Sequence, residues 1–389
     1  MKYVCFAFAF FQFSCFTRQE SKYDSGALDS LIEAEIRASL VVGVSAAILL
    51  DGKLAWSKGY GYADRKTKRP FTPSTVMNIA SISKTFTGAS VMHAVEEGKL
   101  SLDEDINLYL PFGISHPIFP GEKITLRQLA THTSSIRDVW FAYEKSYHNG
   151  GDHPQLLGDY LKDYFVPGGK YYSLDNFLPY KPGTHREYSN IGAGMAGFVV
   201  ESITGKKLNR YSKEAIFGPL KMNDTGWFLS EIDLKNHSTL YEQREDSTVA
   251  IELYGLATYP DGGVRTSVND LAKFLTCIGN DGEYDGARIL KRETVAEMMK
   301  PQFSKTWLPD STDLKENNRG IFWFISGNGR QGHSGGDPGV ATAMHYDPSR
   351  KIGVIFFMNT TGPEAGRAFN RISEALWRQA ETWWPVLEP

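Results

Sequence analysis

The sequence has few cysteines, no excess of basic residues and no apolar run long enough to cross a bilayer. Its three cysteines are Cys5, Cys15 and Cys277, and the first two lie close to the N-terminus. Such a set can build neither a disulfide framework nor a thiolate metal cluster. The 42 basic and 45 acidic residues give a net charge of −3, so no broad basic surface supports a nucleic-acid partner.

The chain does have enough apolar residues for a large core. It contains 389 residues, of which 41% are hydrophobic and 13% aromatic. This length fits two compact domains or one large interleaved domain.

The first residues resemble an export signal. One basic residue, Lys2, precedes an apolar run in MKYVCFAFAFFQFSC that is too short to span a bilayer. Cys15 follows this run as the lipidated cysteine does in bacterial lipoprotein signals, although Gln12 departs from the aliphatic residue usual at that position. We expect residues 1–27 to be a signal segment and tether, with lipidation of Cys15 or simple cleavage nearby as alternatives. The protein would then be exported, either periplasmic or lipid-anchored to the cell envelope.

Sheet-forming segments lie at both ends of the chain. Residues 40–64 predict two strands around Asp51-Gly52, a dipeptide suited to a tight hairpin turn. Residues 339–359 predict two more strands, and a helical pattern follows from Glu364 to about Ala380. These patterns favour one α/β (α+β) domain over residues 28–380, in which a sheet subdomain, about 28–75 and 326–380, encloses a mostly helical insertion of about 80–325.

One candidate nucleophile lies at the start of a predicted helix. In NIASISKTF, Ser81 and Lys84 are three residues apart, which places both side chains on one face of a helix. The helix N-terminus adds partial positive charge beside the serine, and a desolvated lysine can accept a serine proton. However, S-x-x-K arises by chance about once or twice in a chain of this length. In that case Ser81 would merely cap a helix and Lys84 would lie on its solvated face.

A second pattern places a phenol near an amide. In REYSNIGAG, Tyr188 and Asn190 leave the same face of an extended segment. The phenol could share the serine proton, and the amide could hold the lysine and a substrate carbonyl. The alternative is an aromatic core residue beside a turn asparagine, and YHN at Tyr147 to Asn149 shows that the pattern also occurs without special context.

A third pattern, GHSGG at residues 332–336, fits the G-x-S-x-G elbow in which Ser334 would be the nucleophile of an α/β-hydrolase. An elbow is followed by a helix and, later in the chain, by an acid and a histidine. Here the strand-like DPGVATAMHYDP follows, and Asp337 and His345 lie too close along one strand and its turn to complete a triad. We therefore expect Ser334 not to be the nucleophile.

In their order, SISK, YSN and HSG resemble the motifs of the serine β-lactamase and D-alanyl-D-alanine carboxypeptidase superfamily, specifically its class C β-lactamase-like branch, which also holds esterases and D-amino-acid peptidases. The segments GKLAWSKGYGYAD, ITLRQLATHTSSI, KPGTHREYSNIGAG, ESITGKKL, FGPLKMNDTGW, DGGVRTSVNDLAKF and GHSGGDPGV extend the resemblance over about residues 28–380. The resemblance implies an antiparallel sheet flanked by helices and formed by both chain ends, with a mostly helical subdomain inserted.

The resemblance also implies a role for each motif residue. By position, Ser81 would be the acylated nucleophile, Lys84 and Tyr188 the proton-transfer pair, and Asn190 an orienting amide. The backbone N–H groups of Ser81 and Gly336 would form the oxyanion hole.

The third motif departs from the class C β-lactamase pattern. His333, on the strand that would line the cleft, stands where those enzymes have the lysine of Lys-Thr-Gly. A histidine is mostly neutral at pH 7 and holds a substrate carboxylate less firmly than a lysine, which puts efficient β-lactam hydrolysis in doubt. Ser135, in HTSSI, replaces a usual glycine, which questions only the local turn.

An aromatic-rich stretch lies between the first two motifs. Trp140, Tyr143, Tyr171 and Tyr172 would either line an apolar cleft for an acyl or aryl group or pack a long loop onto the body. The sequence favours neither alternative.

The predicted function is that of an exported serine hydrolase acting through an acyl-enzyme on an ester, a D-amino-acid amide or peptide, or a β-lactam. The alternative is a penicillin-recognising binder or sensor that acylates without efficient turnover. We expect no metal or other cofactor, since the histidines form no close H-x-x-x-H pair. The expected partner is a small-molecule or peptide substrate, and lipidated Cys15 would attach the chain to a membrane. The oligomeric state stays open.

Overall fold

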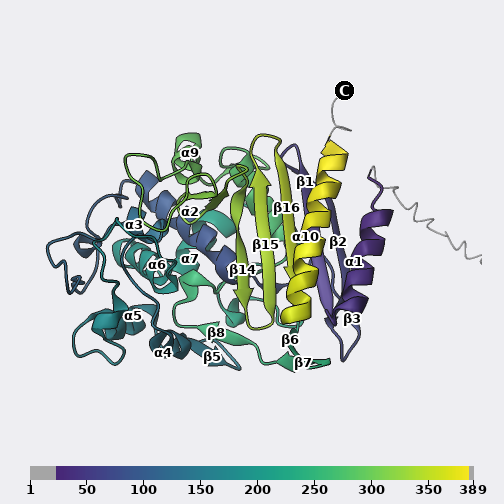
Figure 1. The fold of residues 1–389 in the computed structure, drawn as a ribbon, viewed down its shortest axis with the longest axis horizontal. Helices are drawn as coiled ribbons and strands as arrows, with labels where there is room; N and C mark the ends of the chain where they lie inside the picture. The colour runs from purple at the N-terminus through teal and green to yellow at the C-terminus, as the bar shows by residue number, and fades with distance from the viewer. Residues whose placement is uncertain (1–22, 385–389) are drawn as a thin grey trace, which may run out of the picture.

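The computed structural model describes residues 23–384, which fold around one large antiparallel sheet. Figure 1 shows this sheet with two helices, α1 (Gly26–Ala38) and α10 (Pro363–Trp383), over one face and the mostly helical part of the chain beside it. The sheet has eight strands, in the spatial order β12 (Asn317–Arg319), β13 (Phe324–Ser326), β14 (Gln331–Asp337), β15 (Val340–Asp347), β16 (Ile352–Met358), β1 (Gly43–Leu50), β2 (Lys53–Asp64) and β3 (Arg69–Pro70).

The predicted hairpin between β1 and β2 is present. Asp51 and Gly52 have φ values of 50° and 64°, and two successive residues with positive φ make the turn whose twist matches that of paired strands. β1 then pairs with β16 in an antiparallel register that brings Val44 opposite Met358. The two ends of the chain are thereby joined in the middle of the sheet.

The centre of the sheet is buried on both faces. Every residue of β1 and of β16 is buried, as expected for continuous apolar strands covered on two sides. α1 and α10 pack on one face through residues such as Ile32, Ile372 and Leu376. α8 (Val268–Gly279) contacts β1, β2 and β16, and its residues belong to the other hydrophobic cluster.

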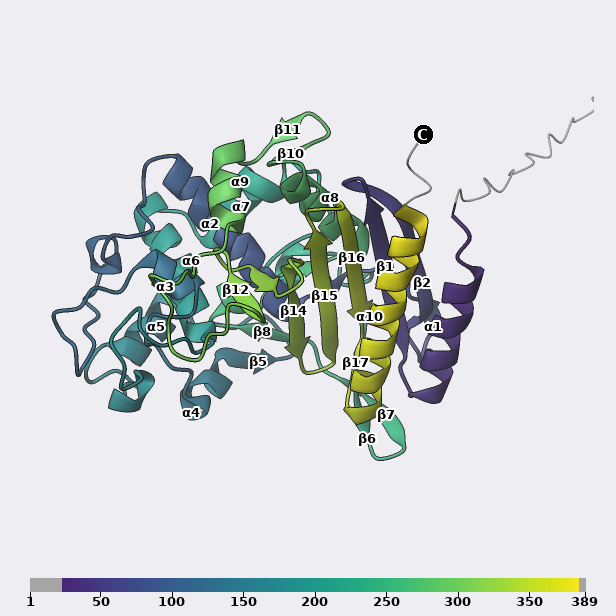
Figure 2. The same cartoon turned by 45° about the horizontal axis from the view of Figure 1, so that its top comes forward.

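The rest of the chain is mostly helical, as Figure 2 shows. Its helices are α2 (Ser83–Glu96), α3 (Leu126–Ala130), α4 (Trp140–Tyr143), α5 (Leu157–Phe165), α6 (Asn190–Thr204), α7 (Leu208–Ser212) and α9 (Arg292–Met299). Short strands, which periodicity did not predict, pair as β4 (Met77–Asn78) with β9 (Arg265–Thr266), β5 (Tyr147–Asn149) with β8 (Tyr254–Leu256), β10 (Glu283–Tyr284) with β11 (Ala287–Arg288), and β6 (Leu240–Arg244) with β7 (Ser247–Ile251) and β17 (Thr360–Thr361).

The predicted fold class, an α/β (α+β) arrangement with an antiparallel sheet formed by both chain ends and flanked by helices, is confirmed. The sheet takes in residues from Asn317 onward, somewhat before the expected start of its C-terminal part at about 326. Gly98, two residues after the end of α2, and Gly205, directly after α6, have φ values of 72° and 67°, the left-handed conformation that ends a helix.

No helix within residues 23–384 combines the length and the apolar character needed to cross a membrane. Cys15, the predicted lipidation site, lies outside the described residues.

Candidate active site

Ser81 lies in a tight turn that connects β4 to α2. The turn is a 3₁₀ helix, Ala80–Ile82, directly followed by α2 at Ser83. Ala80 has a φ of 47°, a left-handed conformation that is costly for a residue with a side chain. The side chain of Asn78 holds this conformation by accepting the Ala80 N–H at 2.6 Å. The turn leaves Ser81 partly exposed at the helix start while its neighbours Ala80 and Ile82 are buried.

Lys84 faces Ser81 from the first turn of α2, as the S-x-x-K spacing predicted. Its Nζ lies 3.1 Å from Ser81 Oγ, 2.7 Å from the side-chain oxygen of Asn190 and 2.7 Å from the backbone oxygen of Asp261. The side chain is fully buried. The two carbonyl oxygens can only accept hydrogen bonds, so two of the three positions on Nζ that point away from its side chain must carry hydrogens directed at them. In a neutral lysine the remaining position, which carries the lone pair, faces the serine hydroxyl.

Asn190 is held in place by a helix cap that sequence reasoning missed. It is the first residue of α6, and the Asp138 carboxylate accepts the backbone N–H groups of Asn190 at 2.7 Å and Ile191 at 3.0 Å. Asp138 also accepts the Ser189 hydroxyl at 2.8 Å. A carboxylate at a helix N-terminus is stabilised by the free N–H groups and the helix dipole. Asp138 thereby fixes the segment that carries both Tyr188 and Asn190.

Asp261 is a second acidic residue that the sequence did not single out. Its side chain is buried, and Tyr143 donates its hydroxyl to one carboxyl oxygen at 3.3 Å, whereas the other oxygen has no hydrogen-bond partner in the described part of the chain. Burial raises the pKa of Asp261 to about 7, although the positive charge of Lys84 opposes this shift. A neutral carboxyl therefore lies behind the lysine over much of the acidic pH range.

Tyr188 lies on the solvent side of Lys84. The centre of its ring is 4.9 Å from Lys84 Nζ, and 39% of the residue is exposed. The centre of the ring lies 4.3 Å from that of His132, whose pKa is lowered well below its usual value by burial and by Lys84. The Tyr188 hydroxyl makes no hydrogen bond to the residues the structure describes, so it is free to engage a substrate.

The edge of β14 forms the wall opposite α2. β13 pairs with β14 only at Gln331 and Gly332, so residues 333–337 have no strand partner on that side. Gly335 packs directly on the turn before Ser81, because a Cβ there would lie 2.3 Å from the Ile79 carbonyl oxygen. Gly336 is exposed and has space around it. The predicted oxyanion donors, the backbone N–H groups of Ser81 and Gly336, thus belong to two segments in contact.

His333 lies on this edge and is neutral. Its Nδ1 makes a 2.6 Å hydrogen bond with the carbonyl oxygen of Ser334, and burial together with Lys84 lowers its pKa to about 3. Ser334 sits within an unbroken strand opposite Ala343, and β15 follows β14 directly. The described residues around Ser334 thus have no elbow helix, which agrees with the expectation that Ser334 is not the nucleophile.

A pocket of about 280 Å³ opens beside Tyr188 and His333. Arg319 lines it, and its guanidinium lies 4.3 Å from the centre of the Phe324 ring. Within residues 23–384 no carboxylate pairs with Arg319, which donates to the backbone oxygen of Asn318. Burial and the nearby Arg186 lower the pKa of Arg319 to about 10, so it stays charged at pH 7. An unpaired cation in a pocket can receive an anionic substrate group.

The aromatic residues of the intervening stretch separate into different environments. Tyr143 reaches Asp261 as described, whereas Tyr171 is buried in the core with its ring 5.2 Å from that of Tyr160. Trp140 is 66% exposed, and Tyr172 is half-buried. Neither alternative from the sequence, a lining of an apolar cleft or the packing of a long loop onto the body, therefore fits all four residues.

Ser135 adopts the conformation that a glycine would take. Its φ is 63°, and its hydroxyl donates to the carbonyl oxygen of Tyr180 at 2.6 Å. The serine hydrogen bond thus helps to hold this residue in the left-handed conformation.

Comparisons with known proteins show which family and fold the chain shares. A family model described as Beta-lactamase matches residues 28–376. Protein flp of Staphylococcus aureus is 28% identical over 250 residues, which are 64% of this chain and 47% of that protein. The chain therefore spans about half the length of the curated relatives it matches first.

Solved structures have the same fold over nearly the whole chain. The octameric penicillin-binding protein homologue from Pyrococcus abyssi superposes with a TM-score of 0.70 at 26% identity, covering 92% of this chain and 78% of that one. D-amino acid amidase from Ochrobactrum anthropi SV3 gives a TM-score of 0.70 at 24% identity, covering 92% and 99%.

Proposed function

The chain belongs to the β-lactamase family, and from that premise we propose that it is a serine hydrolase whose acyl-enzyme forms on Ser81. The observation that carries the proposal is the environment of Lys84 Nζ, which is buried, 3.1 Å from Ser81 Oγ and bonded to two carbonyl oxygens. This geometry orients the lysine as a base toward the serine.

The proposed reaction has two stages. Ser81 Oγ attacks the substrate carbonyl while its proton passes to Lys84. The tetrahedral oxyanion then accepts hydrogen bonds from the backbone N–H groups of Ser81 and Gly336. The proton reaches the leaving group through Tyr188, whose hydroxyl is free and whose ring is 4.9 Å from Lys84 Nζ. In the second stage water attacks the acyl-enzyme, gives its proton to the same pair, and Ser81 leaves with a proton restored.

The substrate is an ester, a D-amino-acid amide or peptide, or a β-lactam, and we propose that it carries an anionic group. The support is the unpaired charge of Arg319 in the pocket beside Tyr188, since His333 is neutral and cannot supply that charge. The relative named D-amino acid amidase is consistent with an amide substrate.

Labelling of the nucleophile tests this proposal. An active-serine phosphonate should modify Ser81, as located by mass spectrometry of peptides, and Ser81→Ala should abolish the label while Ser334→Ala retains it. On a panel of nitrocefin, p-nitrophenyl esters and D-alanyl peptides, Ser81→Ala should reduce kcat/KM by at least about 10³-fold. Label on Ser334 would overturn the assignment, and a stable adduct without turnover would make the protein a penicillin-recognising binder.

We further propose that the protein is exported and anchored through lipidated Cys15. The support is the sequence of residues 1–27 alone, a short apolar run followed by a cysteine and a polar tether. Metabolic labelling with radioactive palmitate should mark the full-length chain in bacterial membranes and not its Cys15→Ser variant. Equal labelling of both would exclude Cys15 as the anchor.

A further inference from the structure

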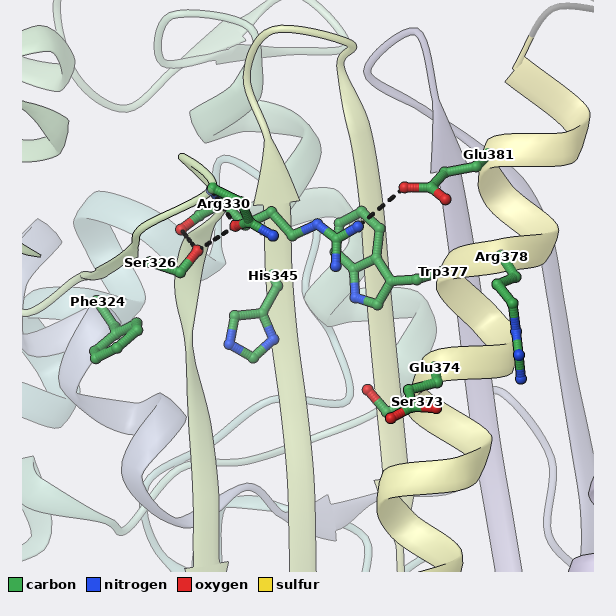
Figure 3. Close-up of a pocket in the computed structure, with 10 residues that line it drawn as sticks. Phe324, Ser326, Arg330, His345, Ser373, Glu374, Trp377, Arg378 and Glu381 are labelled. Atoms are coloured by element: carbon green, nitrogen blue, oxygen red, sulfur yellow. Dashed lines mark hydrogen bonds and ion pairs between the residues drawn. The ribbon is translucent and has the colours of Figure 1, made fainter. Parts of the chain in front are cut away.

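A second pocket, of about 470 Å³, lies on the outer face of the sheet between the β13–β15 strands and α10. It is drawn in Figure 3, with the ring of His345 lying between Phe324 and Trp377. Phe324 and His345 also line the pocket beside Tyr188 and His333. The two pockets therefore share a boundary at Phe324 and His345, and together they extend from Tyr188 to α10.

The junction between the pockets is kept open by a glycine. Phe324, Gly332 and His345 are directly opposite one another on three neighbouring strands, so they face the same side of the sheet. A Cβ at Gly332 would lie 2.0 Å from the carbonyl oxygen of Met344 and 2.8 Å from the ring of His345. The middle position thus has no side chain, and a trough separates the two rings.

His345 is a polar group at this junction, and it has no hydrogen-bond partner within residues 23–384. Neither of its ring nitrogens hydrogen bonds to any residue of the described chain, in contrast to His333, whose Nδ1 bonds with the carbonyl oxygen of Ser334. Burial and the positive charge of Arg330 lower the pKa of His345 to about 4. A neutral imidazole presents one donor and one acceptor, which is the complement of an amide group.

The remaining charges of the outer pocket balance one another. Arg330 lies 3.7 Å from the centre of the Trp377 ring and pairs with Glu381 at 3.0 Å. Glu374 and Arg378, one turn apart on α10, add one charge of each sign. A pocket with balanced charges, two aromatic rings and an unbonded neutral imidazole suits an uncharged polar ligand better than an ion.

We propose that the outer pocket is a distal subsite for an amide-containing leaving group, so that the Ser81 centre acts on a peptide or peptide-like amide that extends past Tyr188 and across Gly332 to His345. The extension lies on the leaving-group side because the connecting pocket is lined by Tyr188, the residue that would protonate the leaving group. This inference rests on the proposed hydrolase function and names its substrate class.

Two peptides with the same acyl part test the subsite. N-acetyl-D-alanyl-glycinamide has a short leaving group, and N-acetyl-D-alanyl-glycyl-glycyl-glycinamide has a long one. Neither carries a terminal carboxylate that could pair with Arg319, so the two peptides differ only in length. The wild-type protein should prefer the long peptide. His345→Leu should lower kcat/KM for the long peptide by about two- to tenfold more than for the short peptide, the value of one hydrogen bond. His345→Gln, which keeps a donor and an acceptor, should retain the preference, as should His148→Leu, a control at an exposed histidine outside both pockets.

A binding measurement separates failure of the subsite from failure of the hydrolase proposal. The long peptide should bind Ser81→Ala, which cannot be acylated, and adding His345→Leu should weaken this binding by a similar factor in calorimetry. An equal loss for both peptides, a preference that His345→Leu leaves intact, or binding that does not depend on His345 would each overturn the subsite. If the wild-type protein hydrolysed neither peptide but the long peptide still bound in a His345-dependent way, the catalytic proposal alone would be contradicted.

Discussion

The two walls of the Ser81 cleft differ in how completely their polar groups are bonded. On the helical wall, Lys84 has three hydrogen-bond partners and Asp138 accepts three donors. On the strand wall, residues 333–337 of β14 lack a strand partner and His345 lacks any hydrogen bond within the described structure. Lys84 and Asn190 are held by these bonds in a fixed geometry, whereas the Tyr188 hydroxyl and the groups that would receive the substrate remain available to it.

Gly335 and Gly336 are neighbours on the strand wall, but only Gly335 packs against the turn before Ser81. Substitution of Gly335 therefore has the largest expected effect. In Gly335→Ala the new methyl would lie 2.3 Å from the Ile79 carbonyl and from Thr342 Oγ1. We expect a loss of about 3 kcal/mol in the free energy of unfolding and, because Ser81 follows two residues after Ile79, a fall of about 10²-fold in kcat/KM.

Gly336→Ala is the matched control, since nothing lies within 4 Å of its Cβ position. Its unfolding free energy should change by no more than about 0.5 kcal/mol. Urea unfolding of both variants measures the difference. Equal stability of the two would show that the strand wall does not need to approach the Ser81 turn as closely as the structure indicates.

Asp261 breaks the pattern of the helical wall, because one of its carboxyl oxygens is buried without a partner. Burial raises its pKa to about 7, above the value of about 3.9 in an unfolded chain. The folded state then binds the proton more tightly, so this group's contribution to stability falls as the pH rises from about 4 through 7.

Asp261→Asn should remove that dependence. Between pH 5 and pH 8 the wild type should lose on the order of 2 kcal/mol more unfolding free energy than the variant. Urea unfolding of both proteins at the two pH values isolates the contribution of Asp261 from those of Lys84, Tyr143, Asp138 and Asp337, which both proteins retain. Parallel pH profiles would mean that Asp261 is ionised in the folded protein.

The parts of the fold that follow from local pattern were predictable from the sequence. The β1–β2 hairpin is encoded by apolar segments on either side of Asp51-Gly52, and α10 by its helical periodicity. The short pairs β4–β9 and β5–β8 were not predictable, because two or three residues carry no periodicity and their pairing is set by distant segments, such as Met77 with Thr266.

The same distinction holds within the candidate site. Ser81 and Lys84 are neighbours through helical spacing, which a motif reveals. Asp138 is 52 positions from Asn190, and Asp261 is 177 positions from Lys84, so their proximity depends on the packing of α2 against α6 and the Asp261 turn. Ser189 caps α6 by accepting the Gly192 N–H, but Asp138, the acceptor that reinforces this cap, comes from another loop.

Removing the cap on α6 tests whether catalysis needs the fixed geometry of the helical wall. It has the smallest expected effect of these variants. Asp138→Ala removes the acceptor for the N–H groups of Asn190 and Ile191 and should cost about 1 kcal/mol of unfolding free energy. Because Asn190 then loses its anchor, kcat should fall by about tenfold with little change in KM. Ser267→Ala removes a comparable cap from α8, where Ser267 accepts the Asp270 N–H at 3.2 Å, and should cost similar stability while leaving kcat unchanged. An equal fall in kcat for both variants would attribute the effect to general loosening of the fold instead of the orientation of Asn190.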